Sequence, residues 1–179
     1  SYSASGKGDN LKWEHKVIVK GHDTEEAPRL GSSDFKIGHL GKQQIFATVE
    51  PWHGNEVVFY TAEGKGGPQR HVIFEGLTEG HEVCVGDFNG DGREDIVAGD
   101  RAKGKVSSSH IFYAGEGSKW QHEELDHLGM SASGCEVADL NGDGRPDIIM
   151  IGGATHNLKW YENLGTASPV KQAKVNTPR

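Results

Sequence analysis

The chain has 179 residues, enough for one domain with a sizeable core, and its charged fraction of 25% argues against a wholly disordered polymer. Its formal net charge of −7 and the lack of any Lys/Arg-rich block argue against nucleic acid or an anionic membrane as a partner. No apolar run is long enough to cross a bilayer, so we expect no membrane span. Cys84 and Cys135 are too few for a disulfide scaffold and lack metal-binding spacing. We therefore expect both to be small, buried apolar side chains.

Short segments rich in Val, Ile, Phe and Tyr recur about every ten residues, separated by Gly-rich or polar turns. In chain order they read HKVIV, QQIFATV, NEVVFY, RHVIF, EVCVG, DIVAG, SHIFY, DIIMI and NLKWY. The 3,4-spaced apolar stripe of an amphipathic helix is missing from all windows longer than about ten residues. The pattern predicts an all-β fold.

These segments belong to a longer repeat. DFNGDGREDIV and DLNGDGRPDII superpose with a shift of 52 residues, and Tyr60, Tyr113 and Tyr161 follow at intervals of 53 and 48. A weaker copy, FKIGHLGKQQIFA, has lost the carboxylates. A unit of about 50 residues with four antiparallel strands is typical of a β-propeller blade. We expect three such blades within residues 12–165, at about 33–75, 81–125 and 133–165, with tails at 1–11 and 166–179.

The third unit lacks a clear fourth strand of the W-x-H type, whereas residues 12–20 supply an orphan one. That strand could complete the last blade of the same chain or of a neighbour, with PVKQAKV near the C-terminus as a competitor. Because a single-ring propeller typically needs about four to eight blades to close, we expect a homodimer that forms a six-bladed ring. Trp13 and residues 17–19 would then be buried at a blade junction. The rival interpretation is a fragment of a longer propeller.

Both acidic segments place oxygen-bearing side chains at alternate positions of a tight, Gly-containing loop, so that the oxygens can converge on one point. Hard oxygen ligands of this kind select Ca²⁺. The expected ligands of two Ca²⁺ sites are Asp87, Asn89, Asp91, the carbonyl of Arg93 and Asp95, and then Asp139, Asn141, Asp143, the carbonyl of Arg145 and Asp147. Position 12 of each segment is Ala98 or Met150 instead of Glu, which excludes an EF-hand. Simple hairpin-turn chemistry of Asn-Gly and Asp-Gly is the alternative.

The segments VGDFNGDGREDIVAG and VADLNGDGRPDIIMIGG resemble the FG-GAP/VCBS repeats of integrin-α-type propellers. The W-x-H and KWYEN segments are similar to those of fungal and bacterial secreted members, including fungal lectins and the propeller part of aldos-2-ulose dehydratases. The resemblance covers residues 12–165. It implies Ca²⁺ between the first and second strands of the blades, an extracellular location, and a role in glycan recognition, adhesion or sugar chemistry.

Two loops that follow second strands carry candidate glycan-binding side chains, namely Trp52, His53, His156 and Asn157. An aromatic ring can stack on a sugar while neighbouring polar groups bond its hydroxyls, although ordinary loop packing would use the same residues. One function class is therefore a lectin-like or adhesion module that binds a glycan or glycoprotein. The other is a sugar dehydratase, isomerase or lyase-like enzyme. The lack of G-x-S-x-G, P-loop and H-E-x-x-H motifs favours the binding module.

Overall fold

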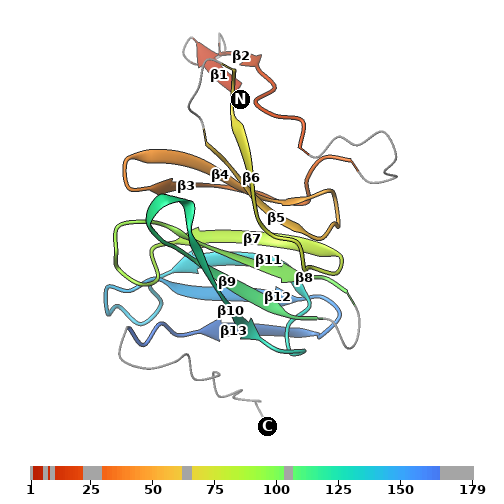
Figure 1. The fold of residues 1–179 in the computed structure, drawn as a ribbon, viewed down its shortest axis with the longest axis vertical. Coiled ribbons are helices and arrows are strands. Elements are labelled where there is room, and N and C mark those ends of the chain that lie inside the picture. Colours follow the sequence, from red (N-terminus) through yellow and green to blue (C-terminus); the bar gives the residue numbers. More distant parts are fainter. Residues whose placement is uncertain are drawn as a thin grey trace.

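The computed structural model describes residues 2–5, 8, 11–21, 30–61, 66–102 and 107–165. Three antiparallel sheets of four, four and three strands confirm the predicted all-β architecture and are consistent with propeller blades (Figure 1). The first sheet contains β3 (Phe35–Leu40), β4 (Gln43–Glu50), β5 (Glu56–Thr61) and β6 (Gln69–Phe74). The second contains β7 (Gly80–Gly86), β8 (Asp95–Asp100), β9 (Ser109–Ala114) and β10 (Trp120–Asp126), and the third contains β11 (Ala132–Ala138), β12 (Asp147–Gly152) and β13 (Asn157–Tyr161).

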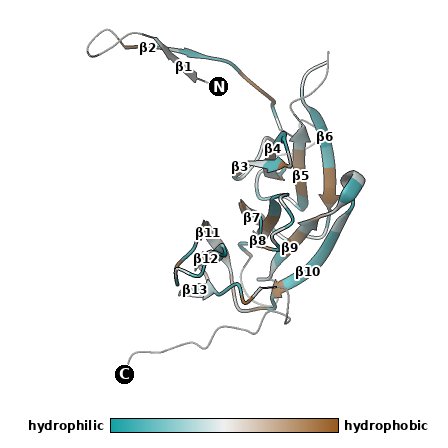
Figure 2. Cartoon of the chain, turned by 90° about the vertical axis from the view of Figure 1, so that its left-hand side faces the viewer, coloured by the Kyte–Doolittle hydropathy of each residue, from teal (hydrophilic) through white to brown (hydrophobic). Residues whose placement is uncertain are grey.

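The strands of each blade pair in sequence order, as antiparallel neighbours joined by short segments of chain do. A single 3₁₀ turn, η2 (Glu116–Ser118), joins β9 to β10. We refer to the sheets as the first, second and third blades. They lie side by side, with β7 of the second blade between β3 and β4 of the first and β11 of the third (Figure 2). No helix in the described residues is long and apolar enough to span a membrane.

Two apolar clusters fill the spaces between neighbouring blades. The cluster between the first and second blades contains Ile45, Phe59, Ile96 and Phe112, all essentially buried. The cluster between the second and third blades is built around Met130, Met150, Ile148 and the two cysteines. Most strand residues of β5, β8 and β9 are buried, which explains why these segments read as nearly continuous apolar runs.

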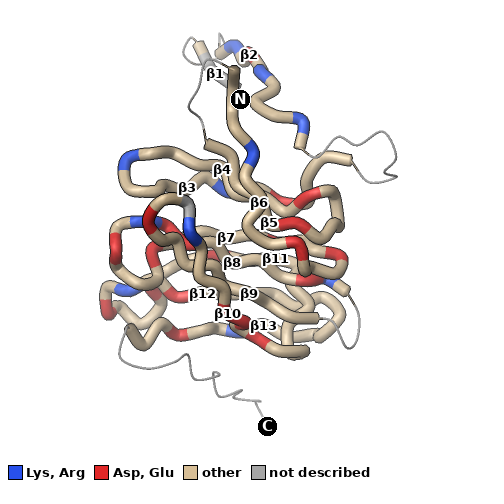
Figure 3. The backbone as a smooth tube through the Cα atoms, viewed as in Figure 1, with Lys and Arg blue, Asp and Glu red and all other residues tan. Residues whose placement is uncertain are grey.

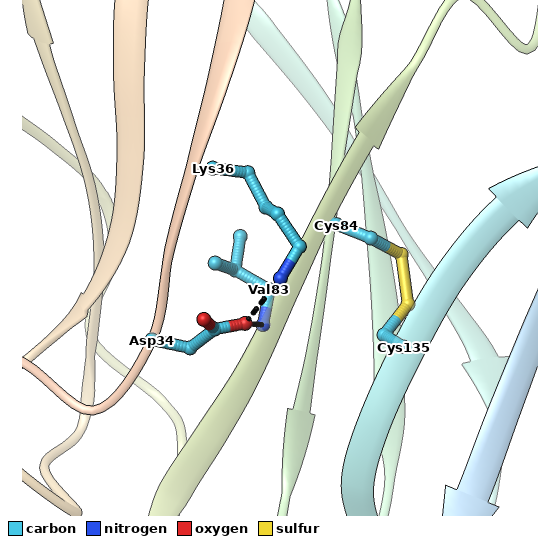
Figure 4. The surroundings of a disulfide bond; sticks show 5 residues. All are labelled: Asp34, Lys36, Val83, Cys84 and Cys135. Carbon is cyan, nitrogen blue, oxygen red and sulfur yellow. Dashed lines mark hydrogen bonds and ion pairs between the residues drawn. A yellow bond between two sulfur atoms is a disulfide. The ribbon is translucent and has the colours of Figure 1, made fainter. Parts of the chain in front are cut away.

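The prediction for the cysteines was wrong in one respect. Cys84 on β7 and Cys135 on β11 are buried as expected, but they form a disulfide with a Cα–Cα distance of 5.7 Å (Figure 4). This distance lies within the range that disulfides adopt. The two residues are 51 positions apart, and only the packing of adjacent blades brings them together. The bond therefore links the first strands of the second and third blades.

The third blade has an open outer edge within the described residues, because β13 pairs only with β12. The orphan strand does not close that edge in this chain. Residues 12–15 of this segment form β2 (Lys12–His15), which pairs instead with β1 (Tyr2–Ser5) inside the predicted N-terminal tail. This β-hairpin stands apart from the blades (Figure 2). Trp13 is 64% exposed, and residues 17–19 are exposed too, so the burial expected for them is not found within one chain. The competing segment PVKQAKV lies outside the described residues.

Candidate metal centre

Both predicted calcium segments are loops between the first and second strands of a blade. The second-blade loop (residues 87–95) connects β7 to β8, and the third-blade loop (residues 139–147) connects β11 to β12. Both loops lie at the same end of the blades (Figure 3). Gly90 and Gly92 adopt φ of 75° and 82°, and the corresponding glycines of the third-blade loop adopt 77° and 85°. These left-handed conformations favour glycine and allow the tight winding of the chain.

In the second-blade loop the side chains of the alternate polar residues turn toward the loop's own backbone. Asp87 Oδ1 accepts hydrogen bonds from the N–H groups of Gly90 and Asp91 at 2.8 and 3.0 Å, and its Oδ2 accepts one from Gly92 at 2.9 Å. Asn89 Oδ1 accepts the Asp91 N–H at 2.9 Å, and Asp91 Oδ1 accepts the Arg93 N–H at 2.8 Å. The loop is thus wound around its own oxygen donors.

Asp95 closes the second-blade loop at the start of β8. Its carboxylate is completely buried and accepts the N–H groups of Phe88 at 3.0 Å and Ala114 at 2.9 Å. Burial raises the pKa of Asp95 to about 7, and the nearby negative charges of Asp91 and Asp87 add to the rise, while the two backbone donors oppose it. The three aspartates are therefore close enough to interact electrostatically.

The third-blade loop repeats these contacts bond for bond. Asp139 accepts the N–H groups of Gly142, Asp143 and Gly144 at 2.7 to 3.1 Å. The equivalent bonds Asp143 N–H to Asn141 Oδ1 and Arg145 N–H to Asp143 Oδ1 measure 3.0 and 2.9 Å. Asp147 is also completely buried and accepts the N–H groups of Leu140 at 3.1 Å and Asn163 at 2.8 Å.

The two loops differ in what surrounds their third expected ligand, which is Asp91 in the second blade and Asp143 in the third. In the third blade Asp143 Oδ2 accepts hydrogen bonds from Arg145 Nη2 and, at 2.9 Å, from Asn141 Nδ2. The backbone N–H of Arg145, followed by these side chains, lowers the pKa of Asp143. In the second blade Arg93 Nη1 lies 3.8 Å from Asp91 Oδ2, too far for a hydrogen bond.

The donor chemistry of both loops fits Ca²⁺, although the described residues do not gather three or more His, Cys, Asp or Glu side chains in a metal-binding arrangement. Each loop offers three carboxylates, one amide oxygen and one backbone carbonyl, all hard oxygen donors. A carboxylate has about four lone-pair sites. Asp87 and Asp139 each accept three backbone N–H groups, whereas Asp91 and Asp143 each accept one. The backbone bonds therefore orient the side chains, and at Asp91 they leave most of the accepting capacity for an ion.

The first blade has a short turn in place of such a loop, as its sequence predicted. Gly41, with φ of 63°, lies in the turn between β3 and β4. The turn packs on the second-blade loop: the Glu94 N–H donates to the His39 carbonyl at 2.8 Å, and His39 Nδ1 lies 3.1 Å from Glu94 Oε2. A β-bridge between Leu40 and Arg93 extends this contact.

The first pair of predicted glycan residues lies at the opposite end of the blades, in the loop between β4 and β5. Trp52 is 49% exposed, and its ring stacks on that of His53 with a centroid distance of 4.1 Å. The His53 ring also lies 5.1 Å from that of His81, and His53 Nε2 lies 3.3 Å from Arg101 Nη1. An exposed indole therefore adjoins a cluster of basic side chains.

The second predicted pair, His156 and Asn157, lies in the corresponding loop of the third blade, with the second blade between the two pairs. His156 is exposed and has φ of 51°, close to the 53° of His53. The Asn157 side chain is engaged within its own blade, since it accepts from Thr155 Oγ1 at 2.7 Å and donates to the Gly129 carbonyl at 2.8 Å. The site of interest at this end therefore centres on Trp52 and His53.

Arg101 and His81 are the residues of that cluster that sequence reasoning did not include. Arg101 is 48 positions from His53 and follows β8, the second strand of its blade, just as Trp52 follows β4. Aligning the loops that follow the second strand of every repeat, whether or not they contain an aromatic residue, would have placed Arg101 at the same end of the blades as Trp52. No local motif marks it.

A family model described as FG-GAP repeat matches residues 80–107, which include β7, the second-blade loop and β8. FG-GAP repeats commonly bind calcium. No solved structure matches the chain. The likeness to lectins or to sugar dehydratases stays a prediction. The predicted resemblance is confirmed at its strongest segment: the second blade of this chain carries an FG-GAP repeat.

Proposed function

We propose that this chain forms part of a calcium-stabilised β-propeller that binds one Ca²⁺ in each of its two acidic loops and a glycan at the opposite end of its blades. The observation that carries the calcium assignment is the duplication of a whole loop. The second-blade and third-blade loops share the same donors, the same glycine conformations and the same pattern of hydrogen bonds. A simple hairpin turn would not require three carboxylates and an amide at fixed positions twice.

The proposed ligands are the predicted ones. In the second-blade loop they are Asp87, Asn89, Asp91, the Arg93 carbonyl and Asp95, and in the third-blade loop Asp139, Asn141, Asp143, the Arg145 carbonyl and Asp147. Every ligand of a site belongs to one short loop, which leaves little room for a substrate. The ion would therefore act structurally by offsetting the repulsion among the carboxylates.

Removal of calcium tests this assignment. A ligand that binds only the native state stabilises it by about 2.7 kcal/mol at a hundredfold excess over its Kd, so two sites contribute about 5 kcal/mol. Thermal unfolding in Ca²⁺ and in EDTA should therefore give clearly different midpoints, with Mg²⁺ as the control ion. Equal midpoints in Ca²⁺ and EDTA would contradict a structural role for calcium.

Glycan binding is supported by the exposed Trp52 ring and the polar groups around it. Aromatic faces that adjoin hydrogen-bonding side chains are suited to pyranose rings. A glycan array probed with the wild type and with Trp52→Ala tests the proposal, and Val72→Ala removes an exposed apolar side chain of β6 as the control. We expect binding that Trp52→Ala abolishes and that Val72→Ala preserves. Binding that survives Trp52→Ala would place the glycan elsewhere, and conversion of a bound sugar would favour the enzyme class.

Self-association is supported by the unfinished third blade. On its outermost strand, Leu158 is 68% and Trp160 39% exposed. A groove of about 470 Å³ between the second and third blades is lined by residues that include Leu125 of β10 and Tyr161 of β13. Unpaired strand edges invite pairing with another chain. We propose that a second copy provides the missing strand with its segment 12–20, giving a six-bladed homodimer.

Light scattering after size exclusion tests the assembly. The proposal expects twice the chain mass of 19.4 kDa at micromolar concentration, and a well-folded monomer would contradict it. Trp13→Asp should shift the dimer toward monomer, whereas a charge introduced at the exposed Leu11 should have little effect. An extracellular location is supported by the Cys84–Cys135 disulfide, because disulfides persist in oxidising compartments.

A further inference from the structure

A pocket at the end of the blades opposite the calcium loops combines basic groups with an exposed aromatic ring. It has a volume of about 550 Å³ and is lined by His53, Thr78, Glu79, Arg101 and Ala102. Trp52 stacks on His53 beside this pocket. We refer to the pocket together with Trp52 and His81 as the basic pocket.

The backbone around the basic pocket is held by hydrogen bonds within the first blade and between the first and second blades. The N–H of Gly80 donates to the carbonyl of Gly54 at 2.8 Å, and the His53 N–H donates to Ser33 Oγ at 2.6 Å. Arg101 is fixed on both sides, because its N–H donates to the Glu79 carbonyl at 3.0 Å and its carbonyl accepts from Ser131 Oγ at 2.8 Å. The pocket is therefore lined by the first and second blades and does not depend on a single loop, and Ser131, directly before the third blade, helps to hold Arg101.

Arg101 differs from the other described arginines in its partners. Arg70 pairs with Glu50 and Glu56, Arg93 lies beside Asp91, and Arg145 pairs with Asp143. Arg101 is exposed and contacts His53, and it forms no ion pair within the part of the chain that the structure describes. In a chain of net charge −7, an arginine that has no carboxylate partner among the described residues is available for an external anion.

The two histidines add ring nitrogens to the basic pocket, whose permanent positive charge is that of Arg101. Burial, followed by the charges of Arg101 and His53, lowers the pKa of His81, which favours its neutral form. His81 Nδ1 lies 2.8 Å from Glu82 Oε1, so Glu82 holds the imidazole in place. Glu79 is exposed at the same pocket and can accept hydrogen bonds from hydroxyl groups.

We propose that the basic pocket selects acidic saccharides, with Arg101 binding the anionic group, His53 orienting the guanidinium by accepting from Arg101 Nη1, and Trp52 stacking on the sugar ring. The planar guanidinium of Arg101 matches a carboxylate in two parallel hydrogen bonds, which a neutral hydroxymethyl group cannot reproduce. This inference rests on the glycan-binding function proposed above and names its ligand class. A uronic carboxylate and a sulfate ester share the required chemistry.

Binding of matched sugars tests the selection. The probes are short oligosaccharides of glucuronic and galacturonic acid, their neutral methyl esters, and sulfated forms of the neutral counterparts. We expect the wild type to bind an acid at least about tenfold more tightly than its ester, in line with a charge-assisted hydrogen bond. The sulfated probes decide whether the pocket is specific for carboxylates or accepts both anions.

Variants of single charged residues show which side chain is responsible for the preference for the acid. Arg101→Gln should weaken binding of the acid about tenfold and leave binding of the ester unchanged, and Arg101→Lys should recover only part of the loss because lysine lacks the planar fork. Lys42→Gln removes the same charge from the exposed turn at the calcium end, and it should change neither the affinity for the acid nor that for the ester. Equal binding of acid and ester, or an Arg101→Gln effect on both, would overturn the acidic-sugar inference and leave glycan binding intact. No binding of any probe would overturn both proposals.

Discussion

The second-blade and third-blade loops have almost the same sequence and hydrogen bonds but different surroundings. The second-blade loop is held from both sides: Glu94 bonds to His39 of the first blade, and the Phe88 carbonyl accepts from Asn163 of the third. The side-chain bonds of the third-blade loop are made within its own blade, through Asn163 and Glu162. Asp87 and Asn89 are partly buried, whereas Asp139 and Asn141 are exposed.

This difference separates what a motif determines from what its neighbours determine. The motif is sufficient to wind both loops in the same way, since every hydrogen bond that the two loops share lies within one blade. Rigidity depends on the blades beside it, and the third-blade loop has one neighbouring blade in this chain. We therefore expect the third-blade loop to open more easily than the second-blade loop. When contacts between the second and third blades are lost, the third-blade loop should be the first of the two to open.

Among the contacts that join these two blades, the disulfide is expected to have the largest effect. For a sequence separation of 51 residues, the chain-entropy model gives a disulfide contribution of about 4 kcal/mol to the free energy of unfolding. The double variant Cys84→Ala/Cys135→Ala should lose that amount in urea unfolding, with reduced wild type as the matched control. A loss below about 1 kcal/mol would show that apolar packing alone holds the blades together.

A smaller effect is expected from Asn163, which joins the third blade to the second-blade loop. Its Nδ2 donates to the carbonyls of Phe88 at 2.9 Å and Pro146 at 3.1 Å. Asn163→Ala should reduce the free energy of unfolding by about 1–2 kcal/mol, because two partly buried carbonyls lose a donor. Hydrogen exchange should show loss of protection in the third-blade loop. Asn55→Ala, which removes one longer bond to Glu75 at 3.3 Å, is the control, and equal losses in both variants would contradict the coupling.

The smallest expected effect concerns calcium affinity. Arg145 occupies Asp143 Oδ2 and brings a positive charge to the third-blade loop, whereas Arg93 is farther from Asp91. Arg145→Ala should therefore lower the Kd of the third-blade loop about threefold at low salt, and Arg93→Ala should change that of the second-blade loop less. Calorimetric titrations at low and physiological salt measure both. Identical changes of Kd in the two variants would contradict the proposed difference in calcium affinity between the two loops.

The repeat made most of the fold predictable. Alternating apolar segments, Gly-containing turns and the 52-residue shift of the acidic motif lead to four-stranded units, and the register of β7 with β8 and of β11 with β12 follows from the loop length. The disulfide could not be inferred in the same way. Cys84 and Cys135 fall at non-equivalent repeat positions, and their proximity depends on which faces of adjacent blades meet.

The candidate site was predictable where its residues are local. The metal donors lie within nine consecutive positions of each loop, so spacing alone identifies them. The basic pocket is assembled from two blades, and Arg101 meets His53 only through the packing of the first blade on the second. The role of Asn157 was also hidden, because its partner Gly129 precedes β11 and lies 28 residues away.

The number of calcium ions bound per chain tests the central claim most directly. Isothermal titration of metal-free protein should give two Ca²⁺ per wild-type chain, one for Asp91→Ala and one for Asp143→Ala. His39→Ala should still bind two, because the first-blade turn has no carboxylates of its own. A wild-type chain that binds no calcium, or an Asp91→Ala/Asp143→Ala chain that still binds two ions, would contradict the assignment of calcium to these loops.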